Sequence, residues 1–226
     1  MPTRSTILLL AALSQLAHGF ADLAFKDSPG WKPLQKQLDA LPVFTVANEQ
    51  GSPLQYEVDG KQCALFYADV EAAKKELANA QAQYPDLGCD LIPVGLGNVF
   101  LLTCEGKATL IPGVTELTAA GMPAGVPAIG QPLPLFACME MSREGPNGDP
   151  VLPLFMSFDD CNAAVKQATA DDDDGGPPLE VVGLSLPSVV EKLSGVGDQA
   201  FSFVPPTASS AYIEAYLNTQ QIPAPE

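Results

Sequence analysis

The order of hydrophobic and polar positions follows one pattern twice along the chain. The first copy runs from Ala64 to Leu96 and the second from Leu152 to Leu184, and the two align without a gap. Each copy opens with an apolar run, continues with apolar residues at helical spacing, and returns to an apolar run that ends in Val-Gly-Leu. Shared spacing across all of these features indicates an internal duplication with a period of about ninety residues.

The helical part of each copy identifies the helix face that we expect to be buried. A capping residue, Asp69 or Ser157, is followed by apolar residues at spacings of three, four and three. These apolar residues are Val70, Ala73, Leu77 and Ala80 in the first copy and Phe158, Cys161, Val165 and Ala168 in the second. The spacing therefore predicts one amphipathic helix in each copy, with this face turned toward a sheet.

The segments around the two copies extend the pattern into two similar halves. Runs rich in branched and aromatic residues predict strands at 42–47, 62–67 and 108–111, with counterparts at 135–141, 151–155 and 201–204. Alternation of strands and helices predicts an α/β (α+β) fold of two pseudo-symmetric repeats, each a small sheet covered by helices. The pattern leaves open whether the two units pack back to back or share one sheet.

Pro and Gly positions and the chain ends predict how the sequence is divided. We expect a signal peptide at 1–19, a presequence remainder with a short helix at 20–41, the first repeat at 42–121, a Pro/Gly linker at 122–133, the second repeat at 134–218 and a disordered tail at 219–226.

The N-terminal apolar run at 6–17 is too short to span a bilayer and is typical of a signal peptide core. Small residues predict cleavage near Gly19, and a buried N-terminal helix is the alternative. Phe20 lies just after that point, and a Phe directly after a signal cleavage site resembles the presequences of algae whose plastids lie inside the endomembrane system. Asp22 and Asp27 depart from a good transit peptide, which is poor in acids. We expect entry into the secretory route.

The net charge of the chain restricts the classes of partner that we expect it to bind. The net charge is −16 at pH 7 and the pI is about 4.2. Such a surface repels nucleic-acid phosphates and anionic lipid headgroups, so we expect no nucleic-acid partner. The four aspartates at 171–174 predict a solvated loop, because the Gly hinge and distal Glu of a calcium loop are missing.

Candidate catalytic chemistry is sparse. The only histidine, His18, lies in the predicted signal peptide, so the mature chain would lack Ser-His-Asp triads and histidine-bound metals. No phosphate-binding glycine loop occurs, and none of the five cysteines forms a C-x-x-C pair. Cys161 falls on the predicted buried helix face. We therefore expect no catalytic residue, no metal and no cofactor, and a protein that is not an enzyme.

The sequences of the two repeats resemble one known family. LPVFTVANEQGSP at 41–53, DGKQCALFYADVEAAKKELANAQ at 59–81 and LIPVGLGNVF at 91–100 are similar to the first unit of the Tic22 family. The segments PLFACMEMS, LPLFMSFDDCNAAVKQA and LEVVGLSLPSVVEKL are similar to its second unit. The resemblance covers about Leu41 to Leu217. The short acidic segment after the signal peptide, the Pro-rich linker and the aspartate run depart from the family pattern.

The resemblance implies a chaperone-like component of protein import across the plastid envelope. Such a protein works in the envelope intermembrane space or periplastid space, and its partners are precursor proteins in transit and translocon subunits. It would hold apolar client segments in an apolar groove, while its acidic surface attracts basic presequences. Peripheral membrane association and the oligomeric state stay open.

The aromatic residues at matched strand positions are the candidate peptide-binding side chains. They are Phe44, Tyr67, Phe136 and Phe155, and the alternative is that all four belong to the core. A second reading of the function is a peripheral structural subunit of another plastid membrane complex, which co-purification would distinguish. A third is an enzyme on an α/β scaffold, which the missing motifs disfavour.

Overall fold

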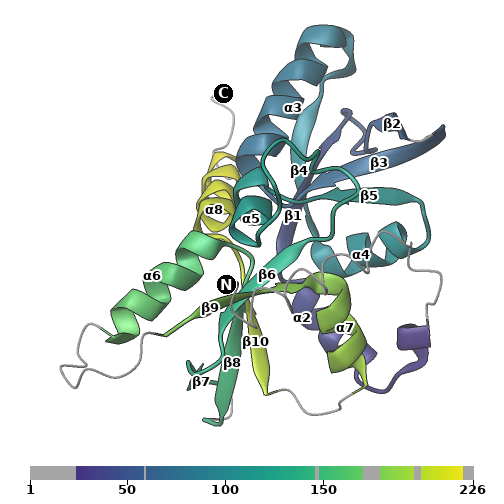
Figure 1. Cartoon of the computed structure of the whole chain (residues 1–226). Helices are drawn as coiled ribbons and strands as arrows, with labels where there is room; N and C mark the ends of the chain where they lie inside the picture. The colour runs from purple at the N-terminus through teal and green to yellow at the C-terminus, as the bar shows by residue number, and fades with distance from the viewer. Residues whose placement is uncertain (1–23, 59, 146–147, 170–178, 196–199, 221–226) are drawn as a thin grey trace.

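The computed structural model describes residues 24–58, 60–145, 148–169, 179–195 and 200–220 (Figure 1). The predicted signal peptide, the aspartate run at 171–174 and residues 221–226 of the predicted tail lie outside the described residues.

Both halves follow one order of elements. After η1 (Ala24–Asp27) and α2 (Trp31–Leu38), the first half comprises β1 (Pro42–Ala47), β2 (Gln55–Val58), β3 (Lys61–Tyr67), α3 (Val70–Gln83), η2 (Pro85–Leu87), β4 (Asp90–Gly95), α4 (Leu96–Cys104), β5 (Ala108–Ile111) and α5 (Val114–Ala119). The second half comprises β6 (Pro134–Cys138), β7 (Arg143–Glu144), β8 (Pro150–Phe155), α6 (Phe158–Thr169), β9 (Val181–Ser185), α7 (Leu186–Ser194), β10 (Phe201–Val204) and α8 (Thr207–Gln220).

The two sheets have the same topology. The first has the strand order β2-β3-β1-β4 with β5 on β3, and the second has β10-β8-β6-β9 with β7 on β8. In each sheet the last strand of the half pairs in parallel with the strand before the long helix, and the other pairs are antiparallel. The predicted α+β fold with two repeats is confirmed, and each repeat has its own sheet.

The terminal helix of each half covers the sheet of the other half. Tyr212 and Ile213 of α8 pack against the cluster that contains Phe44 of the first sheet. Ala120, directly after α5, packs against Phe136 of the second sheet. In Figure 1, α8 lies beside α3 and α5 lies close to the start of α6. The halves are therefore interlocked by an exchange of helices.

The other faces of the two sheets share one core with α2, α4 and α7. This core contains residues of both sheets, such as Phe66 and Leu154. Trp31, Leu34 and Leu38 of α2 reach into it and are each at most 1% exposed. Because α2 contacts both α4 of the first half and α7 of the second, it acts as a wedge between the halves.

A close approach of α2 to α4 explains the glycine at position 97. A side chain at Gly97 would meet the carbonyl oxygen of Gln35 and the carboxylate of Asp39 at 2.7 Å each. The Asp39 Oδ1 accepts a hydrogen bond from the Asn98 amide at 2.9 Å and so caps α4 from the end of α2. A glycine at position 97 is thus required for the close packing of α2 on α4.

Two predicted boundaries need correction. The short helix predicted within residues 20–41 begins at Trp31 and ends at Leu38, since Asp39 turns to cap α4. The tail predicted from residue 219 begins too early, because α8 continues to Gln220. On the predicted helix faces Ala168 is exposed, whereas Cys161 and Val165 are buried as expected.

Candidate functional site

The four predicted peptide-binding aromatics form two equivalent pairs. Phe44 lies opposite Tyr67 across β1 and β3, and Phe136 lies opposite Phe155 across β6 and β8. All four are buried, with at most 8% of each side chain exposed. The ring of Tyr212 packs edge-on against Phe44, with ring centroids 5.5 Å apart.

These pairs therefore lie beneath helices in the described structure. Phe136 is covered by the ring of Phe158, on α6 of its own half, at 5.4 Å, and Ala120 of the first half packs in the same cluster. Peptide binding by the four side chains stays a prediction, and it would require the covering helices to move. A sequence pattern shows that such positions are apolar, but it does not show that α8 of the other half covers Phe44.

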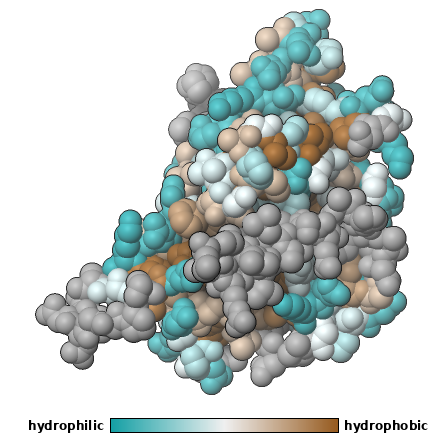
Figure 2. Space-filling model, viewed as in Figure 1, coloured by the Kyte–Doolittle hydropathy of each residue, from teal (hydrophilic) through white to brown (hydrophobic). Residues whose placement is uncertain are grey.

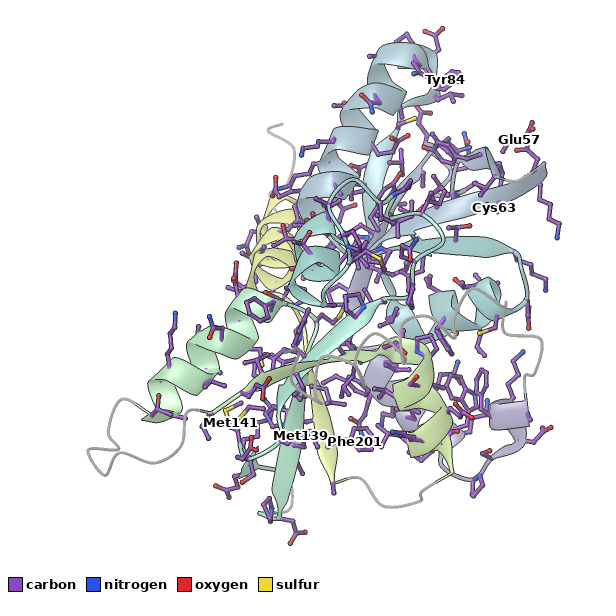
Figure 3. All side chains as sticks on the ribbon, viewed as in Figure 1. Glu57, Cys63, Tyr84, Met139, Met141 and Phe201 are labelled. Carbon is purple, nitrogen blue, oxygen red and sulfur yellow. The ribbon has the colours of Figure 1, made fainter. Side chains whose placement is uncertain are left out.

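An open groove lies elsewhere, between α2 and β10. Its volume is about 1270 Å³. One wall is α2 and the residues just after it, and the other is β10 with the start of β8 and the loop that precedes β8. The lining residues are Lys32, Pro33, Lys36, Gln37, Ala40, Leu41, Gly145, Asp149, Pro150, Val151, Ala200, Phe201, Ser202, Phe203 and Pro205. Phe201 is labelled in Figure 3, on the strand that borders the groove. A groove of this size can hold a segment of extended polypeptide.

The strand that borders the groove stands at the edge of its sheet. Among the described strands, β10 pairs with β8 alone. The carbonyl groups of Ala200 and Val204 accept hydrogen bonds from the amides of Leu152 in β8 and of Met156 directly after it, at 2.9 and 3.1 Å. Because backbone groups alternate in direction along a strand, those of Phe201 and Phe203 face the free edge. An unpaired edge of this kind can pair with another strand.

The groove also contains a buried polar atom that lacks a partner. Among the described residues, the Oγ of Ser202 is buried without a hydrogen bond. A buried hydroxyl without a partner costs free energy of folding, and a ligand in the groove that supplied the partner would offset this cost.

The charge of the groove differs from that of the whole protein. Lys32 and Lys36 line its α2 wall, and Asp149 is its acidic lining residue. The expected attraction of basic presequences can arise from the acidic surface at large, whereas the groove itself favours neutral or acidic segments. Figure 2 shows hydrophilic residues along α3 at the upper end of the molecule.

The thiols are placed for packing. All five cysteines are free, and burial raises the pKa of Cys104 and Cys161 to about 11 each. Cys104 is partly exposed and the other four are buried.

Within the described ranges, no group of three or more His, Cys, Asp or Glu side chains is placed to hold a metal ion. No helix in the same ranges has the length and apolarity needed to cross a membrane.

We expect the thiols of Cys104 and Cys161 to react slowly with Ellman's reagent in the native protein at neutral pH. Thiolate is the reactive form, and a pKa near 11 keeps it scarce until the pH rises toward that value. Cys104 should react first because it is the most exposed, as its replacement by Ser would show. All five thiols should react at once in denaturant, and fast native labelling of a buried cysteine would contradict this placement.

Comparison with known proteins agrees with the fold. The model of the Tic22-like family matches residues 9–212. The solved structure "Tic22 from Plasmodium falciparum" matches with a TM-score of 0.68 and 16% identity, over 84% of this chain and 99% of that one. The structure "Anabaena Tic22 (protein transport)" matches with a TM-score of 0.62 and 20% identity, over 87% and 99%. No curated protein sequence matches this chain.

The family model spans the described part of both halves, from β1 of the first sheet into α8. Membership in this family supports a role in protein transport. The chain belongs to the Tic22-like family.

Proposed function

We propose that the protein binds precursor polypeptides in transit at the plastid envelope and holds them by contact without chemical change. The observation that carries this proposal is the open groove along the free edge of β10. An extended segment laid in this groove can pair its backbone with β10 and place alternate side chains against Phe203 and Val151.

Backbone pairing suits a protein that must accept many clients. Hydrogen bonds to the backbone of Phe201 and Phe203 do not depend on the client's side chains, so affinity comes without strict sequence selection. The apolar wall supplies further binding free energy at about 25 cal/mol for each Å² of apolar surface removed from water. The family's link to protein transport and the predicted signal peptide support this role over that of a structural subunit in another plastid complex.

Two substitutions at Phe203 distinguish the contribution of the backbone to peptide binding from that of the side chain. Phe203→Ala removes the ring, and Phe203→Pro removes the ring and the amide that faces the groove. Pro is tolerated on an edge strand where the amide is not paired within the sheet. We expect Phe203→Pro to bind a peptide about two- to tenfold more weakly than Phe203→Ala, because one backbone hydrogen bond is lost.

The measurement is fluorescence anisotropy with a dye-labelled peptide of alternating Val and Thr. The same peptide with alternate amides methylated is the matched control, and it should bind weakly to the unchanged protein. Circular dichroism and thermal unfolding show that both variants remain folded. Equal affinities of the Ala and Pro variants would contradict strand pairing, and an unchanged affinity in both would remove the groove as the binding site.

A further inference from the structure

A second pocket lies where the two halves meet. It has a volume of about 320 Å³ and lies at the starts of α3, α6 and α8 and the first turn of α5. Two of these helices come from each half. The base of the pocket is apolar and buried, since Ala68, Val70, Leu133 and Met156 line it.

The rim of this pocket is acidic. Asp69, Glu116, Asp159 and Asp160 line it, and no Lys, Arg or His is among the lining residues. The ion pairs among the described residues lie elsewhere, at Lys26–Glu105, Lys74–Glu71 and Lys107–Glu105. Four carboxylates without a cation around one pocket give it a negative potential.

The helix starts do not make the pocket an anion site. The Asp69 carboxylate accepts a hydrogen bond from the Glu71 amide at 2.9 Å. The Asp160 carboxylate accepts hydrogen bonds from the amide and the hydroxyl of Thr207 at 2.8 and 3.0 Å. The carboxylates thus already satisfy the helix donors that an anion would need. Burial raises the pKa of Glu116, and repulsion from Asp69, Asp159 and Asp160 acts in the same direction.

An unsatisfied hydroxyl in the pocket lining points to a ligand. Ser209 lines the pocket and is only 1% exposed. In the described part of the chain its Oγ is buried without a hydrogen-bond partner. A buried hydroxyl of this kind is retained at a cost, and a donor group entering the pocket would satisfy it.

We propose that this junction pocket binds a guanidinium or ammonium group on an aliphatic stem, as in an arginine or lysine side chain of a partner protein. The stem would lie against Val70 and Met156, and the charged head would reach the carboxylates and the Ser209 Oγ. Because both halves contribute to the pocket, binding would also stabilise their junction. The proposal does not depend on the groove beside β10.

The probe is N-acetyl-arginine amide, measured by isothermal titration calorimetry on the full-length protein. We expect saturable binding of one molecule, and Glu116→Gln should weaken it at least about tenfold through loss of a charged hydrogen bond. Asp159→Asn, at an exposed position, should weaken it in the same direction and is a second variant in case the first does not fold. N-acetyl-norleucine amide, which keeps the stem without the charge, should not bind.

Glu57→Gln is the matched control for net charge. Glu57 lies on β2 and projects at the outer end of the first half, away from the junction (Figure 3). It should leave the affinity unchanged. An equal loss of affinity in Glu57→Gln and Glu116→Gln would show general attraction to an acidic protein and overturn the proposal, as would the absence of saturable binding to the unchanged protein.

Discussion

Replacing Leu38 by Ala is expected to lower the free energy of unfolding by about 2 to 5 kcal/mol. Leu38 is fully buried, with 0% of the side chain exposed, in the core shared by both halves. Removing its branched end leaves a cavity in this shared core, which the surrounding elements of the two halves can close only in part.

Chemical denaturation followed by circular dichroism measures this change. Leu217→Ala is the matched control, because Leu217 on α8 is 52% exposed and should change the free energy of unfolding by less than about 0.5 kcal/mol. A loss at Leu38 no larger than that at Leu217 would contradict the role of α2 as a wedge between the halves.

The second large effect is expected when the halves are expressed separately. A first half ending at residue 121 lacks α8, so Phe44 loses its contact with Tyr212. A second half starting at residue 122 lacks α2 and α5. The shared core then loses the apolar side chains of α2, and Phe136 loses its contact with Ala120. We expect neither half to show cooperative unfolding alone, because each would expose large apolar surfaces.

Near-ultraviolet circular dichroism and thermal unfolding of each half test this expectation. Mixing the two halves should restore part of the native signal, since the exchanged helices then find their sheets. Cooperative unfolding of an isolated half with the same midpoint as the full chain would show that the repeats are independent domains.

Much of the fold follows from local patterns in the sequence. Helical spacing after Asp69 predicts α3 correctly from Val70, and Asp69 does cap this helix. The strand at 108–111 is confirmed with the same bounds. These elements are predictable because their apolar spacing and caps depend on neighbouring residues.

Contacts between distant segments were not predictable in this way. The hydrophobic pattern of α8 does not reveal that Tyr212 packs on the first sheet, because its partner Phe44 lies far away in the chain. The same exchange bears on one of the candidate peptide-binding residues. Phe44 lies under Tyr212 of α8 from the other half, which spacing does not reveal, whereas Phe136 lies under Phe158 of its own half.

The groove beside β10 does not follow from the sequence, for a related reason. The local pattern predicts only a strand at Phe201 and Phe203, because their place at the groove depends on which strand stands at the edge of the sheet. That order is set by pairing between β8 and β10, whose residues are about fifty positions apart. The lysines of α2 could not be placed against this strand from spacing alone.

The central claim is that client polypeptide pairs with the free edge of β10. Hydrogen exchange of the Phe201 and Phe203 amides, followed by NMR with and without the alternating Val-Thr peptide, tests it directly. We predict that the peptide slows exchange at these two amides, which face the groove, with little change at Ser202, whose backbone faces β8. Unchanged exchange at Phe201 and Phe203 under saturating peptide would contradict the claim.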